Sequence, residues 1–74
     1  MLKTEGKTEA NIHFGRKLAS LRVERGLSQK ELAEICELNR TYIGTIERGE
    51  KSATVNTIYR LAKGLSISPK DFFA

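Results

Sequence analysis

Cysteine, histidine, proline and tryptophan are nearly absent from this chain of 74 residues, which has one cysteine, one histidine, one proline and no tryptophan. The lone cysteine, Cys36, excludes a disulfide within the chain and is typical of a reducing cytoplasm. The lone histidine, His13, completes no catalytic pattern, and the sequence has neither a phosphate loop nor the spacing of a metal site. We therefore expect a protein that is not an enzyme, binds no metal or other cofactor, and keeps Cys36 as a packed core thiol rather than a nucleophile or redox sensor.

Long apolar runs are also missing. No segment approaches the roughly 20 residues that a membrane span needs, and residues 1–6 lack the pattern of a secretory signal peptide. Hydrophobic residues make up 39% of the chain, which is enough for one small domain with a modest core but not for a deep substrate cavity. We expect a cytoplasmic protein with no membrane contact.

The charge that is present is mostly basic, with a net charge of +4. Lysines and glutamates cancel within residues 1–11, so the whole excess lies in residues 12–74. A small basic domain favours polyanionic partners, although this signal is weak by itself.

Apolar residues at helical spacing, together with helix-capping residues, predict an all-α domain over residues 12–74 after a polar arm over residues 1–11. Five helices are expected: residues 12–25, residue 28 to the turn at Leu38, residues 40–48, residue 52 or 54 to residue 65, and a short helix that begins at Pro69. The residues expected to face the core of the first, second and fourth helices are Phe14, Leu18, Leu21, Leu32, Ala33, Ile35, Cys36, Val55, Ile58, Leu61, Ala62 and Leu65.

Residues 28–48 are typical of a DNA-binding helix-turn-helix. Ser28 and Glu31 have the spacing of a capping box, and Asn39 suits the N-cap of the next helix. That second helix begins Arg-Thr-Tyr and has no carboxylate in its first turn. The major groove of DNA admits one such helix and displays a base-specific pattern of donors and acceptors.

The outer face of this second helix is the expected reading surface. Ile43 and Ile46 must face the core. The opposite side carries arginines, small hydroxyl residues and a glycine that permits close approach: Arg40, Thr41, Gly44, Thr45 and Arg48. Arg40 suits the O6 and N7 atoms of guanine, while Thr41 and Thr45 suit a base edge or a thymine methyl group. The alternative is that these are ordinary exposed residues on a short helix.

Contacts to the DNA backbone are expected at the ends of the helices. Gln29 begins a helix, where free N–H groups favour an anion, and we assign it to a phosphate, with support of the reading helix as a further role. Tyr42 either reaches a phosphate or packs at the rim of the core. The remaining candidates surround the loop after the reading helix: Arg48, Lys51, Ser52 and Thr54. Such contacts fix register without specifying sequence.

Arg22 and Glu47 are expected to form a structural ion pair. Glu47 lies one helical turn after Ile43, and Arg22 one turn after Leu18, so both charges fall beside the apolar side of their helices. A lone charge in such a place is costly. Pairing would fix the angle of the reading helix without touching DNA.

Residues 16–73 resemble the phage-repressor-like helix-turn-helix family, also called the xenobiotic-response-element family. The resemblance rests on Leu21-Arg22, Arg25-Gly26-Leu27-Ser28-Gln29, Glu31-Leu32-Ala33, Tyr42-Ile43, Ile46-Glu47-Arg48-Gly49, Leu61-Ala62, Ser68-Pro69 and Phe72-Phe73. It implies a five-helix, lambda-repressor-like fold, a reading helix in the major groove, and dimers on palindromic operators in the bacterial nucleoid. The Asn-Arg-Thr-Tyr-Ile run is similar to controller proteins of restriction-modification systems, which activate and repress their own operon.

Two further surfaces follow from this resemblance and from the apolar C-terminus. Ile67 and Phe73 are the candidates for a homodimer interface, whereas Phe72 is expected to close the core. Glu34 lies on an acidic edge, where comparable activators touch the sigma subunit of RNA polymerase; a plain solvated face is the alternative.

Two other regulators fit the same sequence. One is an antitoxin that masks a toxin and represses its own operon, and the other is a simple phage-type repressor. The neighbouring gene distinguishes them, because a controller protein accompanies a methyltransferase and an endonuclease while an antitoxin accompanies a small toxin.

Overall fold

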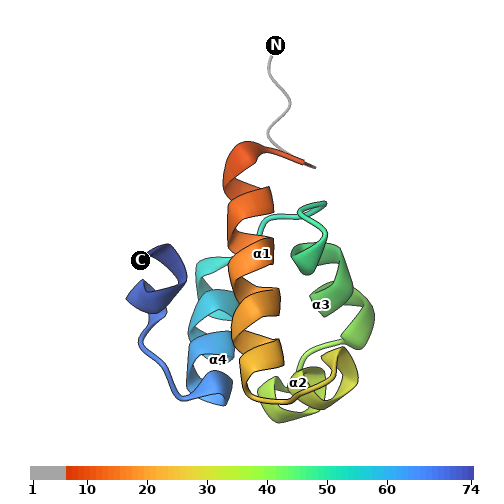
Figure 1. Cartoon of the computed structure of the whole chain (residues 1–74). Coiled ribbons are helices and arrows are strands. Elements are labelled where there is room, and N and C mark those ends of the chain that lie inside the picture. Colours follow the sequence, from red (N-terminus) through yellow and green to blue (C-terminus); the bar gives the residue numbers. More distant parts are fainter. Residues whose placement is uncertain (1–6) are drawn as a thin grey trace.

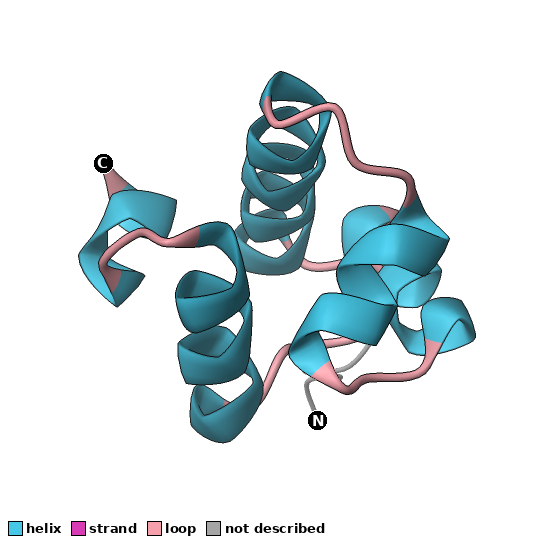
Figure 2. Ribbon diagram, turned by 90° about the horizontal axis from the view of Figure 1, so that it is seen from below, coloured by secondary structure: helices cyan, strands magenta, loops and turns pink. Residues whose placement is uncertain are grey.

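The computed structural model describes residues 7–74, which form a bundle of helices joined by loops and contain no strand (Figures 1 and 2). Four α-helices come in the order α1 (Glu9–Glu24), α2 (Gln29–Cys36), α3 (Arg40–Glu47) and α4 (Val55–Leu65). A short 3-10 helix, Pro69–Phe73, follows and packs beside α1 and α4. None of the helices in this part of the chain is long and apolar enough to cross a membrane.

The all-α class is as predicted, but the fifth α-helix is not. The C-terminal segment makes a 3-10 helix, in which Asp71 N–H donates to the carbonyl of Ser68 at 2.9 Å. The Asp71 carboxylate in turn accepts from Ser68 N–H at 3.0 Å. The 3-10 helix has five residues, and the i→i+3 bonds of this helix type are used in such short segments.

The first helix begins earlier than the sequence indicated. Thr8 is its N-cap, and the hydroxyl of Thr8 accepts from Asn11 N–H at 3.1 Å. Residues 9–11 therefore belong to α1 rather than to the polar arm. Residues 1–6 of that arm lie outside the described part of the chain.

One hydrophobic core joins all the helices, and it consists of Phe14, Leu18, Leu32, Ala33, Cys36, Ile43, Ile46, Leu61, Ala62, Leu65 and Phe72. Phe72 closes this core against Phe14, with ring centroids 4.9 Å apart. Two of the residues expected inside are not: Ile35 is 51% exposed and Val55 is 71% exposed. Val55 is the first residue of α4. Ile35 lies near the end of α2, where a Cβ atom added to Gly64 of α4 would be 3.2 Å from its Cγ2 atom, but half of its side chain stays exposed.

The two helices that carry the predicted ion pair cross at very short range. A Cβ atom added to Gly15 of α1 would collide with the carbonyl oxygens of Ile46 and Glu47 in α3. Gly15 therefore lets the two backbones touch, and α3 lies directly against α1 (Figure 1). This contact sets where the end of α3 can lie.

Candidate nucleic-acid interface

A tight connection joins α2 to α3 and fixes where α3 begins. Glu37 adopts the left-handed conformation, with φ of 57°, which ends α2. Leu38 N–H then donates to the carbonyl of Ala33 at 2.8 Å. The side chain of Asn39 accepts from the N–H groups of Thr41 and Tyr42 at 2.7 and 3.3 Å. The first turn of α3 is therefore capped and held at a defined angle to α2.

Two of the three predicted base-reading residues project freely from this first turn. Arg40 and Thr41 are exposed, and within residues 7–74 no side chain pairs with the Arg40 guanidinium. Thr45 is half-buried, and its hydroxyl donates to the carbonyl of Thr41 at 2.6 Å. The Thr45 oxygen and methyl group, rather than its O–H, are left to face a ligand.

Gly44 does not open the face of α3 as the sequence suggested. It is buried, because the side chains of Gln29 and Arg48 cover it. A Cβ atom at this position would lie 3.2 Å from Nη1 of Arg48 and 3.5 Å from Oε1 of Gln29. The missing side chain thus makes room for these two side chains of the protein itself, and the prediction of open access at Gly44 is wrong.

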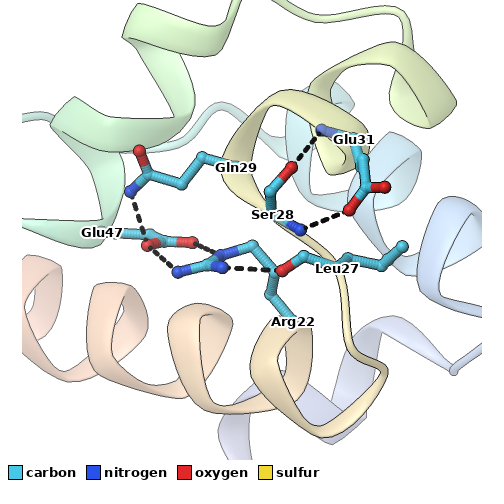
Figure 3. A network of polar contacts seen from close by, with 6 residues as sticks. All are labelled: Arg22, Leu27, Ser28, Gln29, Glu31 and Glu47. Atoms are coloured by element: carbon cyan, nitrogen blue, oxygen red, sulfur yellow. Dashed lines mark hydrogen bonds and ion pairs between the residues drawn. The ribbon is translucent and has the colours of Figure 1, made fainter.

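Arg22 and Glu47 form the ion pair that the sequence predicted (Figure 3). Nε and Nη2 of Arg22 donate to the two carboxylate oxygens of Glu47 at 2.7 and 3.1 Å. Nη1 of Arg22 also donates to the carbonyl of Leu27 at 2.8 Å, so α1, the loop after it and α3 are tied together. The side chains are only 15% and 7% exposed. The hydrogen bonds that Arg22 donates to Glu47 raise the pKa of Arg22 above its usual value.

Gln29 extends this network to α2. Its Nε2 donates to Oε1 of Glu47 at 2.9 Å, which makes Gln29 a support of α3 (Figure 3). The capping box beside it is also present: Ser28 N–H donates to Glu31 at 2.8 Å, and Glu31 N–H donates to Ser28 at 3.0 Å. The bond from the Ser28 backbone lowers the pKa of Glu31. The phosphate contact predicted for Gln29 stays a prediction.

The predicted backbone-contact residues after α3 gather on one loop. Lys51 is exposed and carries a free cation within the described chain. Ser52 donates to the side chain of Asn11 at 2.9 Å, which ties the loop to the start of α1. Arg48 pairs with Glu50 at 3.1 Å, and this hydrogen bond lowers the pKa of Glu50. Glu50 is a carboxylate beside Arg48 and Lys51, and its pairing with Arg48 was not predicted from the sequence.

The other two predicted backbone contacts, Tyr42 and Thr54, meet at a residue that was not predicted. The Tyr42 ring packs at the rim of the core, and its hydroxyl lies 3.3 Å from that of Thr57. Thr54 is the N-cap of α4 and also bonds to Thr57. Thr57 is 7% exposed and is the buried polar residue of the core.

The remaining predicted residues lie away from α3. Glu34 is exposed on α2, Phe73 is 62% exposed, and Ile67 packs partly against the core. Cys36 is buried, and this burial raises the pKa of its thiol. No group of His, Cys, Asp and Glu side chains among residues 7–74 is arranged to hold a metal ion.

Comparison with known proteins identifies the protein family to which this chain belongs. The helix-turn-helix family model matches residues 18–72, and the chain belongs to this family of DNA-binding transcriptional regulators.

Within the family, the chain is similar to restriction-modification controller proteins. It is 41% identical over 59 residues to the control protein C.BamHI of Bacillus amyloliquefaciens, across 78% of this chain and 73% of the relative. Its fold matches that of the controller protein C.AhdI from Aeromonas hydrophila with a TM-score of 0.87 and 38% identity, over 89% of this chain and all of the other. The controller protein C.Esp1396I, solved as a tetramer with its natural 35-base-pair operator, matches with a TM-score of 0.82 and 32% identity, over 89% and 87% of the two chains.

Proposed function

We propose that this protein is a restriction-modification controller that binds a palindromic operator as a homodimer and both activates and represses its own operon. The observation that carries the proposal is the braced α3, whose first turn exposes the side chains of Arg40 and Thr41 with no side-chain partner among residues 7–74. A rigid helix with unpaired hydrogen-bonding groups at its N-terminus suits direct reading of the major groove. Arg40, Thr41 and Thr45 are the proposed base readers.

The proposed backbone contacts lie on both sides of these readers. Gln29 stands at the N-terminus of α2, and Lys51, Ser52 and Thr54 follow α3. Arg48 belongs to the same group, although its guanidinium must leave Glu50 to meet a phosphate. Contacts at both ends of α3 would hold it in register along the groove.

A dimer is proposed because one short helix reads only a few base pairs. A two-fold dimer places two reading helices about one turn of DNA, ~34 Å, apart. Phe73 remains the better of the two predicted interface residues, because Ile67 packs partly into its own core. Val55 and Tyr59 are 71% and 62% exposed one helical turn apart on α4, so they extend the apolar surface available for a partner copy.

Footprinting on the DNA upstream of the gene for this chain tests the proposed function. We expect protected half-sites related by two-fold symmetry, with centres about 10 base pairs apart. We also expect the protection to weaken steeply as salt is raised, since phosphate contacts release counterions. Uniform protection without half-sites, or no protection at low salt, would contradict the proposal.

Activation is proposed to use Glu34 against the sigma subunit of RNA polymerase. Glu34 is exposed on α2, and the side-chain bonds that support α3 in the described chain come from Arg22 and Gln29 instead. Glu34→Lys should therefore abolish transcription activation in vitro while leaving operator affinity within about twofold. Glu24→Lys, the same charge change on the exposed end of α1, is the matched control and should leave activation intact. Equal loss of activation and of DNA binding in Glu34→Lys would argue against a polymerase contact.

A further inference from the structure

A row of three hydroxyl groups runs from the start of α4 to the reading helix. The Thr54 hydroxyl donates to that of Thr57 at 3.0 Å, and the Thr57 hydroxyl lies 3.3 Å from that of Tyr42. Thr54 also accepts from the backbone N–H of Thr57 at 3.1 Å. Within residues 7–74, the pair of Tyr42 and Thr57 is the side-chain hydrogen bond that joins α3 to α4.

The direction of donation along this row has a consequence for Tyr42. A hydroxyl group has one hydrogen to donate and two lone pairs that accept. Either hydroxyl of the Tyr42–Thr57 pair can be the donor; since Thr57 already accepts from Thr54, the arrangement in which Thr57 donates its own hydrogen to the Tyr42 oxygen continues the row in one direction. In this arrangement the hydrogen of the Tyr42 hydroxyl has no acceptor among the three hydroxyl groups. It can therefore be donated to an acceptor on a bound molecule.

The position of Tyr42 indicates what this outside group is. Tyr42 lies in the first turn of α3, next to the exposed Thr41 and two residues after Arg40. Its ring packs at the rim of the core, so the hydroxyl has little freedom to turn elsewhere. Phosphate oxygens along DNA accept hydrogen bonds and donate none, so a tyrosine whose oxygen is already occupied and whose hydrogen is free matches them.

We propose that Thr57 is a positioning residue for DNA binding: it receives a hydrogen bond from Thr54 and passes one to Tyr42, so that Tyr42 presents its O–H to a backbone phosphate. This inference rests on the proposed operator binding. It explains why a polar side chain that is only 7% exposed lies in an otherwise apolar core. It also links the start of α4 to the reading helix.

The test uses the DNA duplex that the wild-type protein selects from a random-sequence pool, with fluorescence anisotropy as the measurement. Thr57→Val keeps the shape of the side chain but removes the hydroxyl, and should weaken binding about fivefold, as the loss of one hydrogen bond does. Thr57→Ser keeps the hydroxyl and should bind within about twofold of wild type. Tyr42→Phe should weaken binding as Thr57→Val does, and the double variant should be no weaker than either single variant.

Independent effects of the two substitutions, or a loss in Tyr42→Phe without one in Thr57→Val, would overturn the proposal. Stability without DNA gives a second measurement if Thr57→Val does not fold. Tyr42→Phe should then lower the melting temperature by about 4 °C, because the hydrogen bond to Thr57 exists in the free protein; no change would also overturn it. If the wild-type chain selects no sequence, the proposed operator binding fails, while this stability measurement still reports on the hydroxyl row.

Discussion

Replacing Glu47 alone should destabilise the protein more than replacing Glu47 and Arg22 together. In Glu47→Leu, the Arg22 guanidinium stays in a place where its side chain is only 15% exposed, with the carbonyl of Leu27 as its remaining partner. An unpaired charge in such a site lowers the free energy of unfolding by about 3 kcal/mol. Arg22→Met with Glu47→Leu removes both charges and restores apolar contact, so it should recover most of this loss.

Urea unfolding of the two single variants and the double variant measures the effect. The control is Glu50→Gln, which breaks the exposed pair of Arg48 and Glu50 and should leave the unfolding midpoint unchanged. A double variant less stable than both single variants would show that the pair itself, rather than the cost of a lone buried charge, supplies the stability.

Glu47→Leu is also expected to weaken DNA binding, because it changes the position of α3. Glu47 receives hydrogen bonds from Arg22 on α1 and Gln29 on α2, so it holds the end of α3 from two sides (Figure 3). These hydrogen bonds therefore fix the orientation of α3, and with it the direction in which the exposed residues of its first turn point.

The features that the sequence predicted well depend on short spacings along one helix. The capping box of Ser28 and Glu31 and the N-cap of Asn39 each join residues within three positions of one another. The pairing of Arg22 with Glu47 is a long-range contact, yet it was predictable because each charge follows a core residue by one turn. Two opposite charges on inward faces have few other ways to be satisfied.

The features that the sequence did not predict depend on which part of each helix is covered by the other helices and their side chains. Val55 and Ile35 have the spacing of core residues but stay more than half exposed, Val55 at the start of α4 and Ile35 at the edge of the contact between α2 and Gly64 of α4. Gly44 faces away from the core but is covered by Gln29 and Arg48, which come from both sides of it in the sequence. Helical periodicity gives the direction of a side chain and not what lies opposite it.

Thr57 was missed for a related reason. Its place three residues after the N-cap Thr54 is visible in the sequence, but its contact with Tyr42 spans fifteen residues and two helices. A threonine in the first turn of a helix usually faces solvent, and only the fold shows that this one is enclosed.

Arg40→Ala is expected to have the largest effect on DNA recognition. The Arg40 guanidinium has no partner among the described residues, so its removal leaves the stability of the free protein unchanged. A bidentate contact between arginine and guanine contributes about 1–3 kcal/mol of discrimination, which corresponds to a loss of about 5- to 150-fold at the correct site. Arg40→Lys keeps the charge but cannot form the two parallel hydrogen bonds, so it should also lose discrimination.

Selection from a random-sequence DNA pool, run at one salt concentration for the wild type, Arg40→Ala and the charge-matched control Lys63→Ala, tests most directly whether α3 reads bases. We expect the wild type and the control to select the same paired half-sites. Arg40→Ala should lose the preference for guanine at one position in each half-site and keep the others. Equal weakening on every sequence, with the selected half-sites unchanged, would place Arg40 on the phosphates and contradict base reading by this residue.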